Sequence, residues 1–392
     1  MDESREFIGA ALSRRTILKW SGAAGMLAVG GLLEGCAPLV IAGVDGTDVN
    51  GLRLPPGFTS RIIAQGGQVI AGTNHQFPAF PDGAATFADL VVPGGWYYAV
   101  NHEIPFSGGG VTSIRFGPDG TIVDAYPILT NTSLNCAGGP TPWGTWLSCE
   151  EHEWGVVWEC DPTQPNSAIR RGALGTFYHE AAAVAADGRV YLTEDRPDGC
   201  FYRLTPTTIG DLSSGVLEVA TGASTSGPVS WVVVPDPTAG TVHCREQIAT
   251  ALHFNGGEGV DTAANLVWFT TKGDNRVWEY NTTSSSVGVR FQGGGSTILS
   301  GVDNLLADTP SGTLLIAEDG GDMQIVMIRP DNSLEAIVQA VGQEGSEITG
   351  PAFSPDGQRL YFSSQRGPTT PFGVIAGITY EVTGPFDALL GR

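Results

Sequence analysis

Residues 180–194 read EAAAVAADGRVYLTE, and this stretch sets the pattern from which the fold can be inferred. Two short apolar runs flank Asp187-Gly188, a dipeptide that favours a tight β-hairpin turn. A glutamate stands at each end, Glu180 and Glu194, fourteen positions apart. The stretch therefore predicts one β-hairpin whose open end carries two carboxylates.

The same spacing of two short strands about a turn recurs along the chain. The starts lie 44 to 47 residues apart, except for one interval of 78 residues after residue 180. Periods near 45 residues are typical of four-stranded propeller blades. We therefore expect an all-β, six-bladed β-propeller with an insertion in the long interval, and residues before about 85 that either close the ring or cover one face. The other five copies are Asp89–Glu103, Cys136–Glu150, Glu258–Lys272, Asn304–Glu318 and Pro351–Gln365.

Composition agrees with an all-β fold and limits the partners. The 392 residues include 55 glycines and 25 prolines, and only 16% are charged, which suits short strands joined by many turns. The formal net charge of -21 argues against nucleic acid, whose phosphates need Lys and Arg. We expect a monomer that does not bind nucleic acid.

The N-terminus has the features of an export signal. Ser13-Arg14-Arg15 precede a glycine-diluted apolar run over 20–33, which is shorter than the roughly 20 residues of a membrane span. The paired arginines resemble a twin-arginine signal, and Cys36 lies in a sequence that resembles a lipobox. We expect residues 1–36 to be a signal peptide, 37–392 to be one propeller domain, and the product to be periplasmic, extracellular or held at a membrane surface through lipidated Cys36.

The open ends of all six hairpins should meet on one face of the propeller, because a hairpin returns the chain to its starting end. Carboxylates crowded there repel one another, and bound cations remove the conflict. Oxygen ligands suit Ca²⁺ or Mg²⁺, whereas an added thiolate suggests a softer transition metal such as iron or zinc. A solvated acidic rim without metal is the alternative. The candidate metal ligands are Glu103, Cys149, Glu150, Glu151, Glu180, Glu194, Glu258, Glu318 and Asp319.

The six cysteines cannot all form disulfides within the mature chain. Without Cys36 five remain, so one is unpaired. Cys149, which precedes two glutamates, is the candidate free thiol. Cys136 and Cys160 are the candidates for a disulfide, since disulfides are common in exported proteins.

Several of these segments resemble the PhoX-type alkaline phosphatase family. The most specific is residues 135–151, NCAGGPTPWGTWLSCEE. The resemblance implies a six-bladed propeller that hydrolyses phosphate monoesters with Fe³⁺ and Ca²⁺ at the channel mouth. It also implies that Cys149 binds iron and that Glu194, Glu258 and Glu318 bridge metals or bind calcium; Cys149, Glu194 and Glu258 are the candidate catalytic residues. The other resembling segments are Asn101–Glu103, Tyr191–Asp195, Asp303-Asn304, Ala317–Asp319 and residues 350–365.

One departure from the family leaves other functions open. Family members with phosphatase activity typically read Phe-x-Arg-Pro-Glu where residues 254–258 read FNGGE, so Gly256 stands in place of the arginine that grips phosphate. Arg196 or Lys272 could replace it. The alternatives are a non-catalytic, calcium-stabilised propeller that binds a partner, and a calcium-dependent lactone or ester hydrolase.

Overall fold

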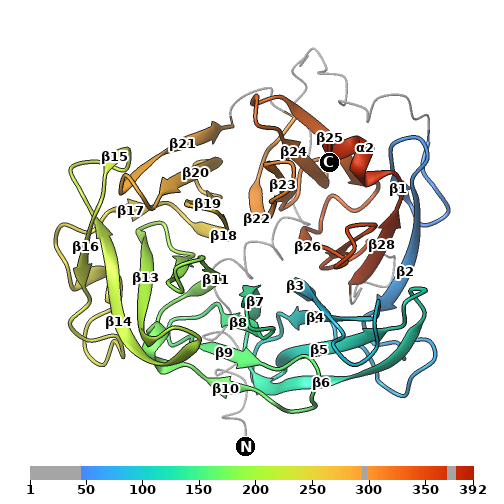
Figure 1. Cartoon of the computed structure of the whole chain (residues 1–392), viewed down its shortest axis with the longest axis horizontal. Helices are drawn as coiled ribbons and strands as arrows, with labels where there is room; N and C mark the ends of the chain where they lie inside the picture. Colours follow the sequence, from blue (N-terminus) through green and yellow to red (C-terminus); the bar gives the residue numbers. More distant parts are fainter. Residues whose placement is uncertain (1–45, 294–297, 369–376) are drawn as a thin grey trace, which may run out of the picture. The chain divides into compact units, whose positions relative to one another are not determined.

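The computed structural model describes residues 46–293, 298–368 and 377–392, so the predicted export signal and Cys36 lie outside the described residues. Six small antiparallel sheets follow one another around a ring (Figure 1). The first long strand of each sheet contacts the first strand of the next, and the sixth returns to the first. These six inner strands surround the axis of the ring, which confirms the predicted six-bladed β-propeller.

The first three blades lie within residues 81–233, apart from one short strand of blade 3. Blade 1 contains β3 (Pro81–Ala88), β4 (Trp96–His102), β5 (Gly109–Phe116) and β6 (Ile122–Thr132). Blade 2 contains β7 (Asn135–Pro140), β8 (Trp146–Glu150), β9 (Val157–Cys160) and β10 (Ile169–Arg170), followed by the 3₁₀ turn η2 (Gly172–Leu174). Blade 3 contains β11 (His179–Val184), β12 (Val190–Glu194), β13 (Gly199–Thr208), β14 (Asp211–Thr221) and β16 (Ser230–Val233), with β17 (His253–Phe254) paired to β13.

The remaining blades recruit strands from elsewhere in the chain. Blade 4 contains β18 (Gly257–Ala263), β19 (Leu266–Thr271), β20 (Arg276–Asn281) and β21 (Ser286–Gln292), with β15 (Gly227–Pro228) at its edge. Blade 5 contains β22 (Val302–Asp308), β23 (Thr313–Glu318), β24 (Gln324–Ile328) and β25 (Leu334–Ala340), with β1 (Leu52–Arg53) at its edge. Blade 6 contains β26 (Ile348–Phe353), β27 (Arg359–Ser364), β28 (Ile378–Thr383) and β2 (Thr59–Gln65).

The long interval in the repeat is an insertion, as its length predicts. Between blades 3 and 4 the chain adds β15, β16, β17 and the 3₁₀ turn η3 (Cys244–Glu246). β16 extends blade 3 and β15 extends blade 4. The insertion therefore widens the outer edges of two blades and leaves the ring of inner strands intact.

The first copy of the repeat is displaced from its predicted position. Its inner strand β3 ends at Ala88, so Asp89 lies in the turn rather than at the start of the hairpin. There its carboxylate accepts hydrogen bonds from the backbone N–H groups of Val91 and Val92, at 2.8 and 3.0 Å. The hairpin opens at Pro81, which pairs with His102, because both strands are longer than in the other copies.

Strands from the two ends of the described chain close the ring. β2 pairs with β28 along blade 6, while β1 pairs with β25 of blade 5. Arg61 of β2 donates two hydrogen bonds of 2.8 Å to buried Glu381 of β28. The Tyr361 hydroxyl donates to the same carboxylate at 2.7 Å. The residues before about 85 therefore include the strands that close the propeller.

We expect Glu381→Ala to lower the free energy of unfolding by about 2–4 kcal/mol, because the substitution leaves the groups that bound the carboxylate without a hydrogen-bond partner. Glu335→Ala is the matched control, since Glu335 is paired with Arg329 and is 39% exposed. That control should cost about 1 kcal/mol at most. Urea unfolding of both variants measures the difference. Equal losses would show that Glu381 does not hold the closing strand.

The chain ends with α2 (Phe386–Leu390), a short helix whose Phe386 packs edge-on against Phe58 and Phe353. Within the described residues, no helix combines the length and apolar character needed to cross a membrane.

Candidate metal centre

The first hairpin of every blade has the same backbone hydrogen bond at its open end. The residue after the second strand donates its N–H to the carbonyl of the residue before the inner strand, at 2.8 to 3.2 Å. We call the donors the outer ring and the second residues of the inner strands the inner ring. The outer ring is Glu103, Glu151, Asp195, Lys272, Asp319 and Gln365. The inner ring is Asp82, Cys136, Glu180, Glu258, Asp303 and Thr349.

Every inner strand is irregular at this same place. In five hairpins the strand register shifts directly after the first residue pair, and in blade 6 it shifts after Thr349. A β-bulge bends its strand and redirects one side chain. The repeated bulge thus explains how residues of one inner strand after another converge at a single end of the channel.

Nine residues bring their possible ligand atoms together at this end, and we call them the acidic cluster. They form four overlapping groups of three, with ligand atoms within 4.8 Å of one another in each group. Most of the nine side chains are buried, including Glu180 and Glu258, both 0% exposed. The members are Asp82, Glu103, Cys136, Glu151, Glu180, Glu258, Asp303, Asp319 and Glu347.

Two basic side chains contact carboxylates of the acidic cluster. Lys272 contacts Asp303 at 3.3 Å and also Asp319. Arg366 contacts Glu347 at 2.8 Å. Eight carboxylates crowded in this way repel one another, and bound cations would stabilise the site.

Burial and mutual repulsion suppress ionisation within the acidic cluster. Burial, followed by repulsion from Glu103 and Glu347, raises the pKa of Asp82 well above its ordinary value. Burial, followed by repulsion from Asp82 and Glu180, does the same to the pKa of the Cys136 thiol, which donates to Glu180 at 3.2 Å. A metal ion would reverse both shifts by favouring the carboxylate and the thiolate.

The donor set fits metal ions. Asp82 Oδ1 is buried without a hydrogen-bond partner in the described part of the chain. Carboxylate oxygens are the ligands that Ca²⁺ prefers, and a thiolate beside them suits a transition metal such as iron. The acidic cluster therefore has the chemistry of a site for more than one ion.

Known proteins share both the sequence pattern and the fold. Residues 108–285 match the family described as Alkaline phosphatase PhoX. The matched segment covers somewhat less than half of the chain. It includes Cys136, Glu151, Glu180 and Glu258 of the acidic cluster. No curated protein matches the sequence.

Solved structures with a similar fold include a PhoX. The Pseudomonas fluorescens PhoX, in complex with vanadate as a transition state analogue, superposes with a TM-score of 0.69 at 18% identity and covers 86% of this chain and 96% of its own. The gluconolactonase XC5397 of Xanthomonas campestris gives 0.51 at 13% identity, covering 83% of this chain and 89% of its own. A Bacteroides thetaiotaomicron protein of unknown function gives 0.52 at 8% identity, covering 83% and 76%. The match to the PhoX family model and the similarity in fold together support a phosphatase-type propeller, in the class of phosphoric monoester hydrolases.

The structure brings five of the predicted ligands into the acidic cluster. Two of them, Glu180 of the inner ring and Glu151 of the outer ring, share a group with the Cys136 thiol. The five are Glu103, Glu151, Glu180, Glu258 and Asp319.

Cys149, expected to be the PhoX-type iron ligand, lies elsewhere. Its side chain is fully buried in a hydrophobic cluster with Leu147 and Val157. Alternate residues of a strand share a face, so Cys149 follows Leu147 into the core. Burial, and then Glu150, raise the pKa of its thiol. Cys136 is the thiol that the structure places at the channel mouth.

The disulfide expected between Cys136 and Cys160 is absent from the structure. Both are buried free thiols, as are the other three described cysteines, Cys149, Cys200 and Cys244. Cys136 instead turns toward Glu180.

Glu150, Glu194 and Glu318 also lie outside the acidic cluster. Each is the last residue of a second strand, one position before the outer ring. Because successive side chains of a strand point in opposite directions, a shift of one residue turns the carboxylate away from the channel mouth.

These three carboxylates bind groups within their own blades and loops. Glu150 accepts a 3.0 Å bond from the Ser133 N–H. Glu318 accepts bonds of 2.7 and 3.0 Å from the backbone N–H groups of Ser300 and Gln324, and burial raises its pKa to about 8.

Glu194 is held by a larger set of donors. Arg245 contacts it at 3.1 Å and the Tyr202 hydroxyl donates to it at 2.8 Å. The Cys200 N–H adds a third bond, at 3.1 Å. Glu194 therefore joins blade 3 to the insertion that carries Arg245.

Sequence reasoning missed four members of the acidic cluster: Asp82, Cys136, Asp303 and Glu347. Cys136 starts a hairpin in the repeat frame, but the prediction assigned its thiol to a disulfide. Asp303 lies one residue before the predicted start at Asn304. A frame that paired the second residue of each inner strand with the residue after the second strand would have found both.

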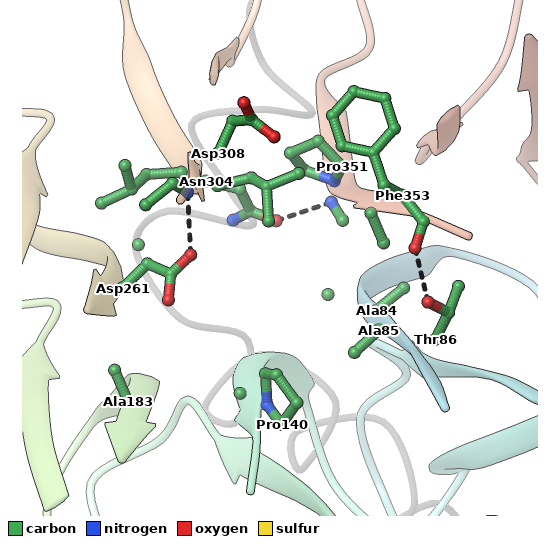
Figure 2. Close-up of a pocket in the computed structure, with 18 of the residues that line it drawn as sticks. Ala84, Ala85, Thr86, Pro140, Ala183, Asp261, Asn304, Asp308, Pro351 and Phe353 are labelled. Atoms are coloured by element: carbon green, nitrogen blue, oxygen red, sulfur yellow. Dashed lines mark hydrogen bonds between the residues drawn. The ribbon is translucent and has the colours of Figure 1, made fainter. Parts of the chain in front are cut away.

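Behind the acidic cluster, the inner strands enclose a cavity of about 520 Å³ along the axis of the ring. Figure 2 shows Ala84, Ala85, Pro140 and Ala183 around it, residues from the three inner strands β3, β7 and β11. Asp261 adds a carboxylate, which accepts a 2.8 Å bond from the Ala307 N–H. Among the described residues, no member of the acidic cluster lines this cavity, but sequence neighbours of the cluster such as Gly83, Ala137 and Ala181 do, so the cluster lies next to it.

Proposed function

We propose that the protein is an exported, metal-dependent phosphoric monoester hydrolase whose metal ions are held by the acidic cluster. The observation that carries this proposal is the convergence of eight carboxylates and one thiol at one end of a propeller that resembles PhoX. Bound cations would reduce the repulsion among the carboxylates, and they would also attract a phosphate dianion that the bare carboxylates would repel.

The residues divide by chemistry into two proposed kinds of ligand. Cys136 would hold Fe³⁺ together with carboxylates of its two groups, which include Asp82 and Glu180. Asp303, Asp319 and Glu347 form the all-oxygen group, which would hold Ca²⁺. Glu180 and Glu258 belong with Asp303 to the group between them, so they would bridge the two regions.

The bound ions would attract the phosphate dianion and stabilise the negative charge that develops on the leaving oxygen. The chain would fix the geometry. The bulged inner strands hold the carboxylates, while Gln365 donates to Glu103 at 2.7 Å and also to Asp82. Lys272 fixes Asp319 and Asp303 against each other.

We also propose that residues 1–36 direct export of the protein and that the exported protein is a monomer. The arginine pair before an apolar run supports a twin-arginine route, which carries folded proteins and would let iron be inserted in the cytoplasm. Cys36 would attach the product to a membrane if it is lipidated. Cell fractionation of the parent and of Arg14→Lys/Arg15→Lys should separate an exported from a retained protein.

The test is metal reconstitution followed by a substrate panel. We expect protein loaded with Fe³⁺ and Ca²⁺ to hydrolyse p-nitrophenyl phosphate, and chelation to remove both activity and metal. Lactones form the second arm of the panel, because a gluconolactonase shares the fold. Metal-replete protein that opens lactones and leaves phosphate esters intact would replace our proposal with the lactonase alternative, and one that does neither would favour a binding module.

A further inference from the structure

We propose that Arg196 binds the phosphate group of the substrate at the edge of the acidic cluster. The inference rests on the proposed phosphatase function and names the residue that grips the anion. It starts from a basic side chain whose charge the described residues leave uncompensated.

Arg196 lies on the face that carries the acidic cluster. It follows Asp195 of the outer ring, and its carbonyl accepts a 2.8 Å bond from the Gly256 N–H, two residues before Glu258. On its other side, the Asp195 N–H donates to the Tyr178 carbonyl at 3.2 Å, two residues before Glu180. The turn is thus bonded to the starts of two neighbouring inner strands, each of which supplies a cluster carboxylate.

The other basic residues at this face are already engaged. Lys272 is paired with Asp303 and Asp319, and Arg366 is paired with Glu347. None of the ion pairs within residues 46–293, 298–368 and 377–392 includes Arg196. Its Nε is buried without a hydrogen-bond partner. Arg196 therefore keeps its charge, and its terminal nitrogens, rather than the buried Nε, would meet an incoming anion.

An aromatic ring holds the guanidinium in place. Arg196 Cζ lies 4.8 Å from the centre of the Tyr178 ring. Stacking of this kind leaves the in-plane N–H groups of the guanidinium open, and these match two oxygens of a phosphate. The stack therefore orients Arg196 without using the donors that a phosphate needs.

The backbone explains why the cation comes from this turn and not from residue 256. Gly256 has a φ of +71°, in the region that favours glycine. A Cβ there would stand 3.2 Å from Asp195 Oδ1. A side chain at 256 would be strained and would crowd the turn that carries Arg196, so this chain supplies the basic group from the adjacent blade.

Calorimetric titration of inorganic phosphate into the metal-loaded protein tests the role. We expect Arg196→Ala to weaken phosphate binding about 10- to 100-fold, the loss typical of a hydrogen bond between charged groups. Arg196→Lys should recover part of it, since a lysine keeps the charge but not the fork. Metal content should equal that of the parent in both variants.

Arg203→Ala is the matched control. Arg203 also stacks on an aromatic ring, that of Trp231 at 4.5 Å, but it is paired with Glu218 at 2.8 Å and lies in β13. It should bind phosphate like the parent. Arg196→Ala with parental affinity, or a parent that binds no phosphate, would overturn the inference.

Tyr178 is the positioning residue, and a conservative variant separates its role from simple stability. Tyr178→Phe keeps the ring and should bind phosphate within about twofold of the parent. Tyr178→Leu removes the stack and should weaken binding about threefold to tenfold, in line with a cation–π contact. Equal affinities for the two variants would remove Tyr178 from the mechanism.

Hydrolysis measured on the same variants distinguishes this inference from the proposed function. If the parent is an active phosphatase, Arg196→Ala should raise KM for p-nitrophenyl phosphate more than it lowers kcat. If the parent binds phosphate through Arg196 but hydrolyses no ester, the proposed function fails and the anion site stands.

Discussion

Cys136→Ser is expected to lose bound iron and about 100-fold or more of the phosphatase turnover, whereas Cys149→Ala should retain both. Residues that only support metal ligands cost 10- to 100-fold when mutated, so a direct ligand should cost at least the upper figure. Both cysteines are buried free thiols in the same hairpin, which makes them a matched pair.

The expected difference comes from the surroundings of the two thiols. Cys136 belongs to two of the four ligand groups, one with Asp82 and Glu103 and one with Glu151 and Glu180. Serine at this position offers an alcohol, a much poorer ligand for iron than a thiolate. Cys149 contacts apolar side chains, and its replacement by alanine should cost about 1–2 kcal/mol of stability.

Elemental analysis and steady-state kinetics on the two purified variants give the answer. The melting temperature of each variant separates metal loss from unfolding. Iron retained in Cys136→Ser, or lost from a folded Cys149→Ala, would return the iron site to the cysteine first expected from the family resemblance.

The fold could be predicted because its signal is repeated. Each hairpin contributes a short apolar pattern, and five of the six predicted copies coincide with an inner strand and its neighbour, as for Glu180–Glu194 in β11 and β12. A single hairpin would have been ambiguous. Six at nearly constant spacing imply a ring, because every blade must bury both of its faces against other blades.

The face of the candidate site was also predictable, but its exact residues were not. Glu150 and Glu151 are adjacent in sequence, yet one binds Ser133 and the other joins the acidic cluster. Which of two neighbours faces the channel depends on the strand register, and a shift of one residue reverses it. The spacing of fourteen residues in the sequence repeat does not reveal where the bulges that set this register lie.

The sequence repeat could not predict two members of the acidic cluster, for a different reason. Asp82 precedes the predicted first copy because the β3–β4 hairpin is longer than the others. Glu347 comes before its strand and enters the site from a loop. Such positions depend on loop conformation, which the spacing of apolar residues does not encode.

Gly139→Ala is expected to destabilise the fold by roughly 4 kcal/mol or more, the range of severe backbone clashes. Gly139 lies in β7, and a Cβ there would stand 1.7 Å from the carbonyl oxygen of Ala182 in β11. The obstacle is backbone, so no side chain can rotate away. Blades 2 and 3 would have to separate along their inner strands.

Gly144→Ala is the matched control, because it makes the same substitution in the turn of the same hairpin. Gly144 has a φ of +87°, and a methyl group added there would meet nothing within 4 Å, so the cost should be the roughly 1–2 kcal/mol of a left-handed alanine. Thermal and urea unfolding compare the two. Similar losses would mean that the blades do not approach as closely as the structure places them.

The same substitution tests how packing and chemistry are linked in this ring. Cys136 stands three residues before Gly139 and donates to Glu180 of β11 at 3.2 Å. Any separation of β7 from β11 therefore lengthens a contact within the proposed metal centre. If Gly139→Ala still folds, we expect it to bind less iron than Gly144→Ala, because the glycines of residues 135–151 let two backbones approach until their ligands meet. Parental iron content in a folded Gly139→Ala protein would show that the centre tolerates movement of the blades.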